Sequence, residues 1–389
     1  MEEDEYGFRY PVIDSTKCIE CGLCKKVCAY QNANNDNEPM SAYVAQTKSD
    51  LINKSASGGI FASIANEILK ESGIIYGVSL EYTCDKLFAK HVRITSNEEL
   101  IKLQGSKYLQ SDTGDTFKQV KEDLLNGRNV LYSGTPCQIA GLKSFLQKNY
   151  ENLYCVDIIC HGTPNNRFFQ DYILSLEEKY NDKILDFKFR DKVGGWGLTA
   201  NAYTANAYTA NAGNKIFPCE ESSYYMYFLK SYTYRINCYS CKYANKHRSG
   251  DITIGDYWGV QLEHSEYFID NGGDINPRLG VSCIIVNNEH GKKLLGKYAN
   301  SINLKDTSFD RVAKHNDQLR RPCDFNPKKR MEILEVYRNY GYDAVEKVYS
   351  NYIREEKLKR TIKNFIKKVL PNFMVVKLKE FRGKYRDRK

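Results

Sequence analysis

The most specific chemical pattern in the sequence is a run of four cysteines near its start. The run has the spacing C-x2-C-x2-C-x3-C and consists of Cys18, Cys21, Cys24 and Cys28. The short loops between these residues let successive thiolates reach neighbouring irons of a 4Fe–4S cubane. Zinc is the alternative, but structural zinc sites usually consist of two separated ligand pairs. The spacing therefore predicts an iron–sulfur site.

The same run occurs twice in bacterial ferredoxins, because the fourth cysteine of each run ligates the cluster of the other run. Here it occurs once, so the fourth ligand stays open. Either Cys28 folds back onto its own cluster, or a partner chain completes the unit, or a first half lies outside this sequence. Residues 4–14 look like the β-hairpin that joins two ferredoxin halves, which favours the last alternative. We therefore expect residues 1–38 to be a partial 4Fe–4S ferredoxin-type segment.

Four further cysteines occupy positions where a second cluster could bind. Cys137 lies at a strand-to-helix turn, where the helix N-terminus favours a thiolate, and Cys160 lies at the carboxyl end of the next predicted strand. If these strands are parallel, both thiols open into the same crevice, the usual ligand site of an open α/β sheet. Cys238 and Cys241 form a C-x2-C pair in a polar stretch typical of a loop. Together the four could ligate a cluster; the alternative is that Cys137 and Cys160 are small buried residues.

The remaining cysteines have no partner at metal-ligand spacing: Cys84, Cys155, Cys219, Cys283 and Cys323. Two of them, Cys155 and Cys283, lie within apolar strands and are expected in the core. No apolar run approaches the ~20 residues of a membrane span, and the acidic opening does not resemble a signal peptide. We therefore expect a cytoplasmic protein whose thiols are reduced and available to metals.

Three short turns could hold the phosphates and the ring of a nucleotide cofactor. In the first, Ser57 would cap a helix while the backbone N–H groups of Gly58 and Gly59 face an anion; a plain helix cap is an equally good interpretation. The other two turns offer a lysine for a phosphate, a tyrosine to stack on a ring and a Gly-Thr pair. Their residues are Gly105, Ser106, Lys107, Tyr108, Gly134 and Thr135. His161, beside Cys160, is expected to hydrogen-bond near that ligand or to transfer protons, and no catalytic acid is assigned.

Alternating strands and helices must position these residues. The predicted strands are residues 42–47, 74–80, 87–95, 129–133, 153–160, 251–259 and 281–287, and the predicted helices are 57–73, 96–103, 116–127, 138–148 and 167–180. A capping-box pattern, Ser96 to Glu99, opens one helix. The strand 153–160 is apolar enough to be covered on both faces, which indicates a mixed α/β fold with a partly parallel sheet. The five-residue repeat within 200–212 is expected to form a strand or hairpin arm before a turn at 212–214.

The basic charge of the chain is concentrated in its tail. The net charge is +9 overall, and residues 357–389 carry thirteen Lys and Arg against two acidic residues, so the rest is nearly neutral. This distribution argues against a nucleic-acid-binding protein. Within a helical C-terminal region, residues 357–370 predict a basic amphipathic helix ended by Pro371, which suits peripheral contact with an anionic membrane. Packing of this helix on the body is the alternative.

Seven motifs, in this order, resemble the β-subunit family of coenzyme F-420 (deazaflavin) hydrogenases and dehydrogenases, ferredoxin-fused type, to which 7-hydroxymethyl chlorophyll a reductase is related. They are SASGGIF, QGSKYLQSD, VLYSGTPCQIAGL, DIICHGTP, INCYSCKYA, R-SGDITIGDYWG and GVSCIIVN. The resemblance covers roughly residues 17–300. It implies an iron–sulfur flavoprotein that carries FAD near a 4Fe–4S cluster. It also implies that the ligands of this cluster are Cys137, Cys160, Cys238 and Cys241.

Together these observations predict a cytoplasmic oxidoreductase. Electrons would pass from ferredoxin or another one-electron donor through 4Fe–4S clusters to FAD, and on to an organic acceptor that the sequence does not name. A non-catalytic electron-relay subunit and a zinc-stabilised scaffold are the alternatives. The expected segments are the ferredoxin-type residues 1–38, the two parts of the flavin-binding core at 41–125 and 126–300, and the helical basic tail 301–389.

Overall fold

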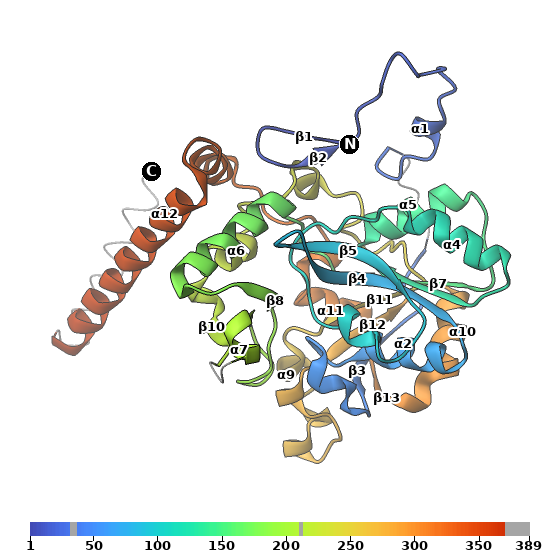
Figure 1. Cartoon of the computed structure of the whole chain (residues 1–389). Helices are drawn as coiled ribbons and strands as arrows, with labels where there is room; N and C mark the ends of the chain where they lie inside the picture. The colour runs from blue at the N-terminus through green and yellow to red at the C-terminus, as the bar shows by residue number, and fades with distance from the viewer. Residues whose placement is uncertain (32–36, 210–212, 370–389) are drawn as a thin grey trace, which may run out of the picture. The chain divides into compact units, whose positions relative to one another are not determined.

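A mixed sheet of eight strands lies at the centre of the first of two compact units, Met1–Leu334 and Glu335–Lys389 (Figure 1). The computed structural model describes residues 1–31, 37–209 and 213–369, except for the side chains of 208–209 and 356–369. The strand order is β13-β3-β12-β11-β7-β6-β4-β5. The strands are β3 (Ser41–Thr47), β4 (Ile74–Thr83), β5 (Lys86–Ile94), β6 (Val130–Gly134), β7 (Leu153–Ile158), β11 (Ile252–Asp256), β12 (Ser282–Val286) and β13 (Ile302–Thr307).

Four neighbouring strands of this sheet, β4, β6, β7 and β11, are parallel, and the remaining pairs are antiparallel. Successive side chains of a strand point to opposite faces. Leu131 and Val156 therefore belong to the core on one face, and Tyr132 and Cys155 to the core on the other. The mixed α/β class with a partly parallel sheet is confirmed.

Helices cover both faces of the sheet, which explains why central strands such as β6 and β7 are mostly buried and apolar. On one face, α2 (Ile60–Lys70) and α10 (Glu289–Tyr298) pack against the sheet, and α4 (Thr116–Leu125) and α5 (Pro136–Leu146) pack against the other (Figure 1). A third cluster includes α11 (Phe309–Lys314). Cys155 and Cys283 are fully buried in β7 and β12, as expected for core residues.

A second, three-stranded sheet has the order β10-β9-β8. It consists of β8 (Ile184–Lys188), β9 (Thr199–Thr204) and β10 (Lys215–Pro218), and α6 (Asn166–Tyr180) contacts β8. The expectation of a strand through the repeat is only half right, because the repeat leaves β9 and forms a short helix, α7 (Ala205–Thr209). The turn expected at 212–214 begins outside the described residues.

The first residues form a hairpin, with β1 (Glu2–Glu3) antiparallel to β2 (Arg9–Tyr10), so it begins and ends earlier than the hairpin expected over residues 4–14. A short helix, α1 (Leu23–Lys26), lies within the cysteine run. The hairpin is held to the body by a salt bridge of 2.8 Å between Arg9 and Asp112. The backbone carbonyl of Tyr6 also accepts a hydrogen bond of 2.9 Å from the Asn165 side chain.

The helix start predicted at Ser96 is wrong. The helix expected from Ser96 is a single turn, α3 (Leu100–Leu103), with Glu99 as its N-cap and without a side-chain capping bond. The Glu99 carboxylate accepts a hydrogen bond from the backbone N–H of Thr95 rather than from that of Ser96. The capping box predicted from Ser96 is therefore not formed. The other short helices of the unit are α8 (Ser223–Leu229) and α9 (Val260–Glu263).

The C-terminal region is helical, as expected, and consists of α12 (Pro327–Val369) with a non-helical backbone at Gly341. The amphipathic face expected for residues 357–370 lies outside the described side chains, so its contact with a membrane stays a prediction. Among residues 1–31, 37–209 and 213–369, no helix combines the length and apolar character needed to cross a bilayer. The division into four segments also stays a prediction.

Candidate functional site

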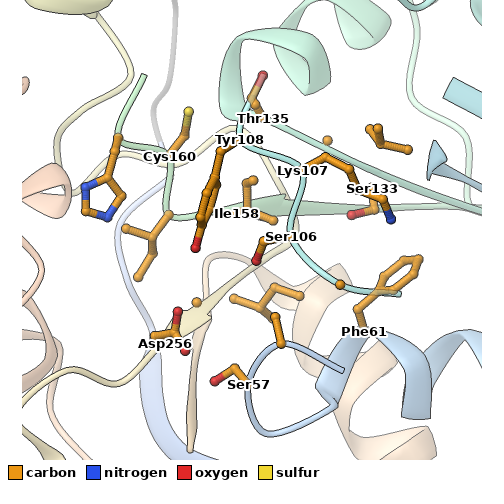
Figure 2. Close-up of a pocket in the computed structure, with 18 of the residues that line it drawn as sticks. Ser57, Phe61, Ser106, Lys107, Tyr108, Ser133, Thr135, Ile158, Cys160 and Asp256 are labelled. Carbon is orange, nitrogen blue, oxygen red and sulfur yellow. The ribbon is translucent and has the colours of Figure 1, made fainter. Parts of the chain in front are cut away.

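A cavity of about 490 Å³ opens where three parallel strands end. Its wall includes Gly134, Ile158 and Asp256, the last residues of β6, β7 and β11. The three predicted cofactor turns converge here: Ser57, Gly59, Gly105, Ser106, Lys107, Tyr108, Gly134 and Thr135 all line the cavity. Figure 2 shows Thr135 and Cys160 at one end, Ser57 and Asp256 at the other, and Tyr108 between them.

The Ser57 turn does not cap α2 as predicted. Ser57 Oγ donates to the carbonyl oxygen of Val281 at 3.0 Å, and the N–H of Gly58 donates to Ser282 Oγ at 3.0 Å. Gly58 is absent from the cavity wall, and a Cβ there would lie 2.6 Å from the carbonyl oxygen of Ala45. Close packing on β3 and β12 therefore explains this glycine. The N-cap is Gly59, with a φ of +78°.

The N-terminus of α2 nevertheless faces the cavity. An α-helix leaves its first backbone N–H groups without helical partners, and these groups attract anions. The first residues of α2, Ile60 and Phe61, line the cavity wall. The anion-binding capacity expected of the Ser57 turn therefore belongs to the first turn of the helix.

Lys107 has a different partner from the one expected. Its Nζ donates to the carbonyl oxygens of Lys102 at 3.1 Å and Gln104 at 2.8 Å, so it closes its own loop instead of extending toward a phosphate. Burial lowers the pKa of Lys107 to about 7, against the opposing effect of the Asp186 and Glu81 carboxylates. The lysine therefore shapes the cavity wall.

Tyr108 offers an aromatic surface at the middle of the cavity. One face of its ring stacks on Phe228, with centroids 4.4 Å apart and 13° between the planes. Its hydroxyl lies 3.3 Å from the Arg190 guanidinium. A ring held from two sides is rigid enough to act as a stacking wall for a planar ligand.

Lys192, which the sequence analysis did not select, fixes the loop before α2. Its Nζ donates to the backbone carbonyls of Ile52 at 2.7 Å and Ser57 at 2.8 Å, and to that of Leu279. Burial, together with the charge of Arg190, lowers the pKa of Lys192 to about 8. These three carbonyls lie 87 to 140 residues away from Lys192 in sequence, so no local pattern indicated the contact.

A charged and aromatic group at the Asp256 end of the cavity was also missed. Asp256 accepts two hydrogen bonds from Arg190, at 2.8 and 3.3 Å, and one of 2.8 Å from the Trp196 indole N–H. Trp196 stacks on Trp258, with centroids 5.1 Å apart and 5° between the planes. Asp256 and Trp258 line the cavity. The only signal in the sequence was the motif that contains Asp256 and Trp258, and its chemistry depends on the distant Arg190.

The four cysteines predicted to hold a core cluster face a common region; they are the cysteine quartet, Cys137, Cys160, Cys238 and Cys241. Cys137 lies in the first turn of α5 and Cys160 follows β7 in the cavity wall. Burial raises the pKa of Cys160 well above its usual value, and the thiols of Cys238, Cys137 and Cys241 raise it further. The four thiols are therefore close enough to interact electrostatically.

The four thiols of the quartet are soft donors of the kind that bind iron–sulfur clusters. In the described part of the chain, no three or more His, Cys, Asp or Glu side chains lie close enough to hold one metal ion. A cubane binds each thiolate to a different iron, so its ligands stand farther apart than those of one zinc ion. Four soft sulfur donors facing a common region thus fit an iron–sulfur cluster.

Cys323 is a fifth thiol in this region, although no sequence pattern gave it a partner. Its Sγ donates to the carbonyl oxygen of Cys238 at 3.7 Å, and it adds to the rise in the pKa of the Cys238 thiol that burial causes. Of the other cysteines, Cys219 is buried and Cys84 is exposed. A separation of 85 residues explains why the Cys323 contact was not foreseen.

The N-terminal run is mostly exposed, with Cys18, Cys21 and Cys24 on the surface and Cys28 half-buried. Cys28 lies close to the quartet, because its thiol and the thiols of two quartet members influence the pKa of the same tyrosine. Burial raises the pKa of Tyr243, and the thiols of Cys137, Cys241 and Cys28 raise it further. The two cysteine sites are therefore neighbours in the fold.

His161 lines the cavity beside Cys160, as its position in the sequence suggested. Burial lowers the pKa of His161, against the opposing effects of Asp256 and Asp317. Its role as a hydrogen-bonding neighbour or a proton carrier stays a prediction.

Two family models match most of the chain and describe the same family. The family model for the N-terminal part of the coenzyme F-420 hydrogenase/dehydrogenase beta subunit matches residues 42–118, and the model for the C-terminal part matches residues 127–310. Among solved structures, one chain of the F-420-reducing NiFe hydrogenase complex from Methanosarcina barkeri, in a xenon derivative, is 15% identical. That match covers 77% of this chain and 92% of the other, with a TM-score of 0.45. No curated protein matches.

Proposed function

The chain belongs to the coenzyme F-420 hydrogenase/dehydrogenase beta-subunit family of redox proteins, and we propose that it is an iron–sulfur flavoprotein oxidoreductase. It would take electrons from ferredoxin or another one-electron donor protein and pass them through 4Fe–4S clusters to FAD and an organic acceptor. The observation that carries this proposal is the position of Cys160, which belongs to the quartet and also lines the cavity. A cluster and a flavin would then share one wall.

The cavity offers the groups that a flavin nucleotide needs. Its volume of about 490 Å³ is within the usual range of small-molecule sites. The first turn of α2 would bind a phosphate, and Ser106 and Thr135 add hydroxyls. Tyr108 and Trp258 provide aromatic walls for a planar ring. FAD, when bound, supplies two-electron chemistry, and the protein determines how its ring faces the cluster ligands and the acceptor.

The electron path would begin at the N-terminal run. Cys18, Cys21 and Cys24 are exposed, so a cluster on them is accessible to a donor protein. Cys28, the last cysteine of the run, lies close to the quartet, as the shared tyrosine neighbour indicates. The quartet would then pass electrons to the cavity through Cys160. The fourth ligand of the outer site stays open between Cys28 and an additional group.

An electron-relay subunit is the second candidate function, because the matched family consists of beta subunits, which act within larger assemblies. In that case the protein would hand its electrons to another enzyme. The two functions differ in one property: an oxidoreductase returns electrons from its flavin to a small molecule, and a relay returns them to a protein.

Anaerobic purification followed by reduction tests the proposal. We expect a brown protein that contains FAD, acid-labile sulfide and about four firmly bound irons in the core cluster. Reduced ferredoxin should bleach the flavin, and a panel of organic acceptors, deazaflavin included, should restore its absorbance. Reoxidation by a protein alone identifies the relay, and a colourless protein with zinc in place of iron rejects both functions.

A further inference from the structure

A continuous series of hydrogen bonds connects the buried His91, in β5, with Cys137 at the start of α5. His91 Nε2 lies 3.2 Å from the carbonyl oxygen of Ser133, and its Nδ1 lies 3.2 Å from Ser111 Oγ. Gln138 Nε2 donates to the same Ser111 oxygen at 2.9 Å. The series continues from the Gln138 side chain to Thr135 and Cys137.

The carbonyl of Ser133 determines the direction of these bonds. A carbonyl only accepts, so His91 Nε2 carries the proton and Nδ1 accepts. Ser111 then donates to Nδ1, and its oxygen accepts from the Gln138 amide. The amide is thereby oriented with its oxygen toward Thr135. Burial lowers the pKa of His91 to about 4, so the imidazole keeps a single proton at neutral pH.

The hydroxyl of Thr135 has two acceptors for its one hydrogen. Gln138 Oε1 accepts from the Thr135 backbone N–H at 3.0 Å and lies 3.0 Å from Thr135 Oγ1, which forms a capping box at α5. Thr135 Oγ1 also lies 3.2 Å from Cys137 Sγ. A free thiol can donate to this oxygen, whereas a cysteine that binds iron is a thiolate and only accepts.

We infer that Thr135 is a positioning residue for a cluster bound by the quartet, and that its hydroxyl donates an O–H···S hydrogen bond to Cys137. The inference rests on the proposed function. Gln138 Oε1 keeps the backbone N–H of Thr135 as a donor, and Thr135 Oγ1 still accepts from the backbone N–H of Gln138, so the capping box stays intact when the hydroxyl hydrogen turns to the sulfur. Hydrogen bonds to cluster sulfurs influence the reduction potential, because they stabilise the more negative, reduced cluster. The hydroxyl therefore raises the potential.

The same groups also face the cavity. Ser111, Ser133, Thr135 and Gln138 all line its wall. The series thus connects the wall of the flavin site with a ligand of the cluster site, and its orientation depends on His91, which is buried behind both. A change at Thr135 should therefore be measurable at the cluster without removing any of its ligands.

An anaerobic redox titration, followed by electron paramagnetic resonance of the reduced cluster in the full-length protein, tests this inference. Thr135→Val keeps the shape of the side chain and removes the hydroxyl, so we expect a lower midpoint potential with unchanged iron content. Thr135→Ser should restore a value near that of the wild type. Ser308→Ala is the matched control, because it removes an N-cap hydrogen bond from α11 and should leave the potential unchanged.

Resonance Raman spectra provide a second measurement. The iron–sulfur stretching bands of the wild type should shift in D₂O, and Thr135→Val should lose part of that shift. If Thr135→Val binds the cluster with the wild-type potential and the wild-type deuterium shift, the role of Thr135 is wrong while the proposed function stands. If the wild type binds no cluster at the quartet, the proposed function itself is wrong.

Discussion

The hydroxyl of Tyr243 donates a hydrogen bond to the backbone carbonyl of Ala29. This bond joins the residue after Cys28 to the residue two positions after Cys241. A second contact lies beside it, because Lys242 Nζ sits 5.4 Å from the centre of the Tyr30 ring. The end of the N-terminal run is thus attached to the loop that carries half of the quartet.

Tyr243→Phe should weaken this attachment and slow electron transfer between the two cysteine sites. The variant loses one hydrogen bond, which contributes about 1 kcal/mol to stability, and both sites keep all their thiols. In stopped-flow experiments with reduced ferredoxin, the flavin should be reduced more slowly in this variant, while the iron content stays the same. Tyr82→Phe is the control, because Tyr82 forms its hydrogen bond with Asp85 at an exposed position. Equal flavin rates in the two variants would contradict the proposed path.

Serine in place of any member of the quartet should remove the core cluster, because a hydroxyl is a poor ligand for iron compared with a thiolate. Iron and sulfide analysis of the four variants measures the loss. Cys155→Ser is the control, since Cys155 is fully buried in β7 and belongs to the core. It should cost about 1–3 kcal/mol of stability through a buried hydroxyl and keep its iron. Full iron in Cys137→Ser and Cys160→Ser would exclude the quartet.

Asp256→Ala should destabilise the protein far more than the removal of an exposed carboxylate. It would leave the charge of Arg190, whose side chain is 1% exposed, without its partner, and a broken buried pair costs about 3–5 kcal/mol. Asp112→Ala breaks the exposed pair with Arg9, where both side chains are more than 40% exposed, and should cost less than about 1 kcal/mol. Urea unfolding of the two variants should therefore differ clearly in midpoint, and similar midpoints would refute the argument.

The pair of Asp251 and His290 should give one histidine an elevated pKa. Burial alone would raise the pKa of Asp251, but the hydrogen bond with His290 and the charge of Lys143 lower it to about 2. Asp251 in turn raises the pKa of His290, whose Nδ1 lies 3.5 Å from its carboxylate. The stabilisation from charged His290 is complete below its ordinary pKa, near 6.5, and is lost as the pH rises through the raised value.

Proton NMR titration of the histidines tests this expectation, with His290→Gln to assign the resonance. Asp251→Asn should bring the pKa of His290 down to or below its usual value. As the pH is lowered toward 6.5, the wild type gains stability from the protonation of His290. This gain should be absent from Asp251→Asn. An unchanged pKa would show that another group holds the charge on His290.

The sequence by itself determined the mixed α/β class, most strands of the large sheet and the positions of Cys137 and Cys160 at strand ends. Apolar periodicity reports which faces are buried, and strands followed by helices indicate parallel pairing. It also indicated three turns that line one cavity: the turn at Gly134 and Thr135 follows the parallel strand β6, whereas only the fold brings the turns at 57–59 and 105–108 beside it. These features depend on local spacing, which can be read directly from the chain.

Only the tertiary structure decided which partners the polar side chains take. Ser57 donates to Val281 instead of capping its helix, and Cys323 contacts the loop of Cys238. The buried pair of Arg190 and Asp256 joins residues 66 positions apart. A hydrogen-bonding group binds whichever acceptor the fold brings within about 3 Å, and that acceptor usually lies on another element, so no local pattern specifies it.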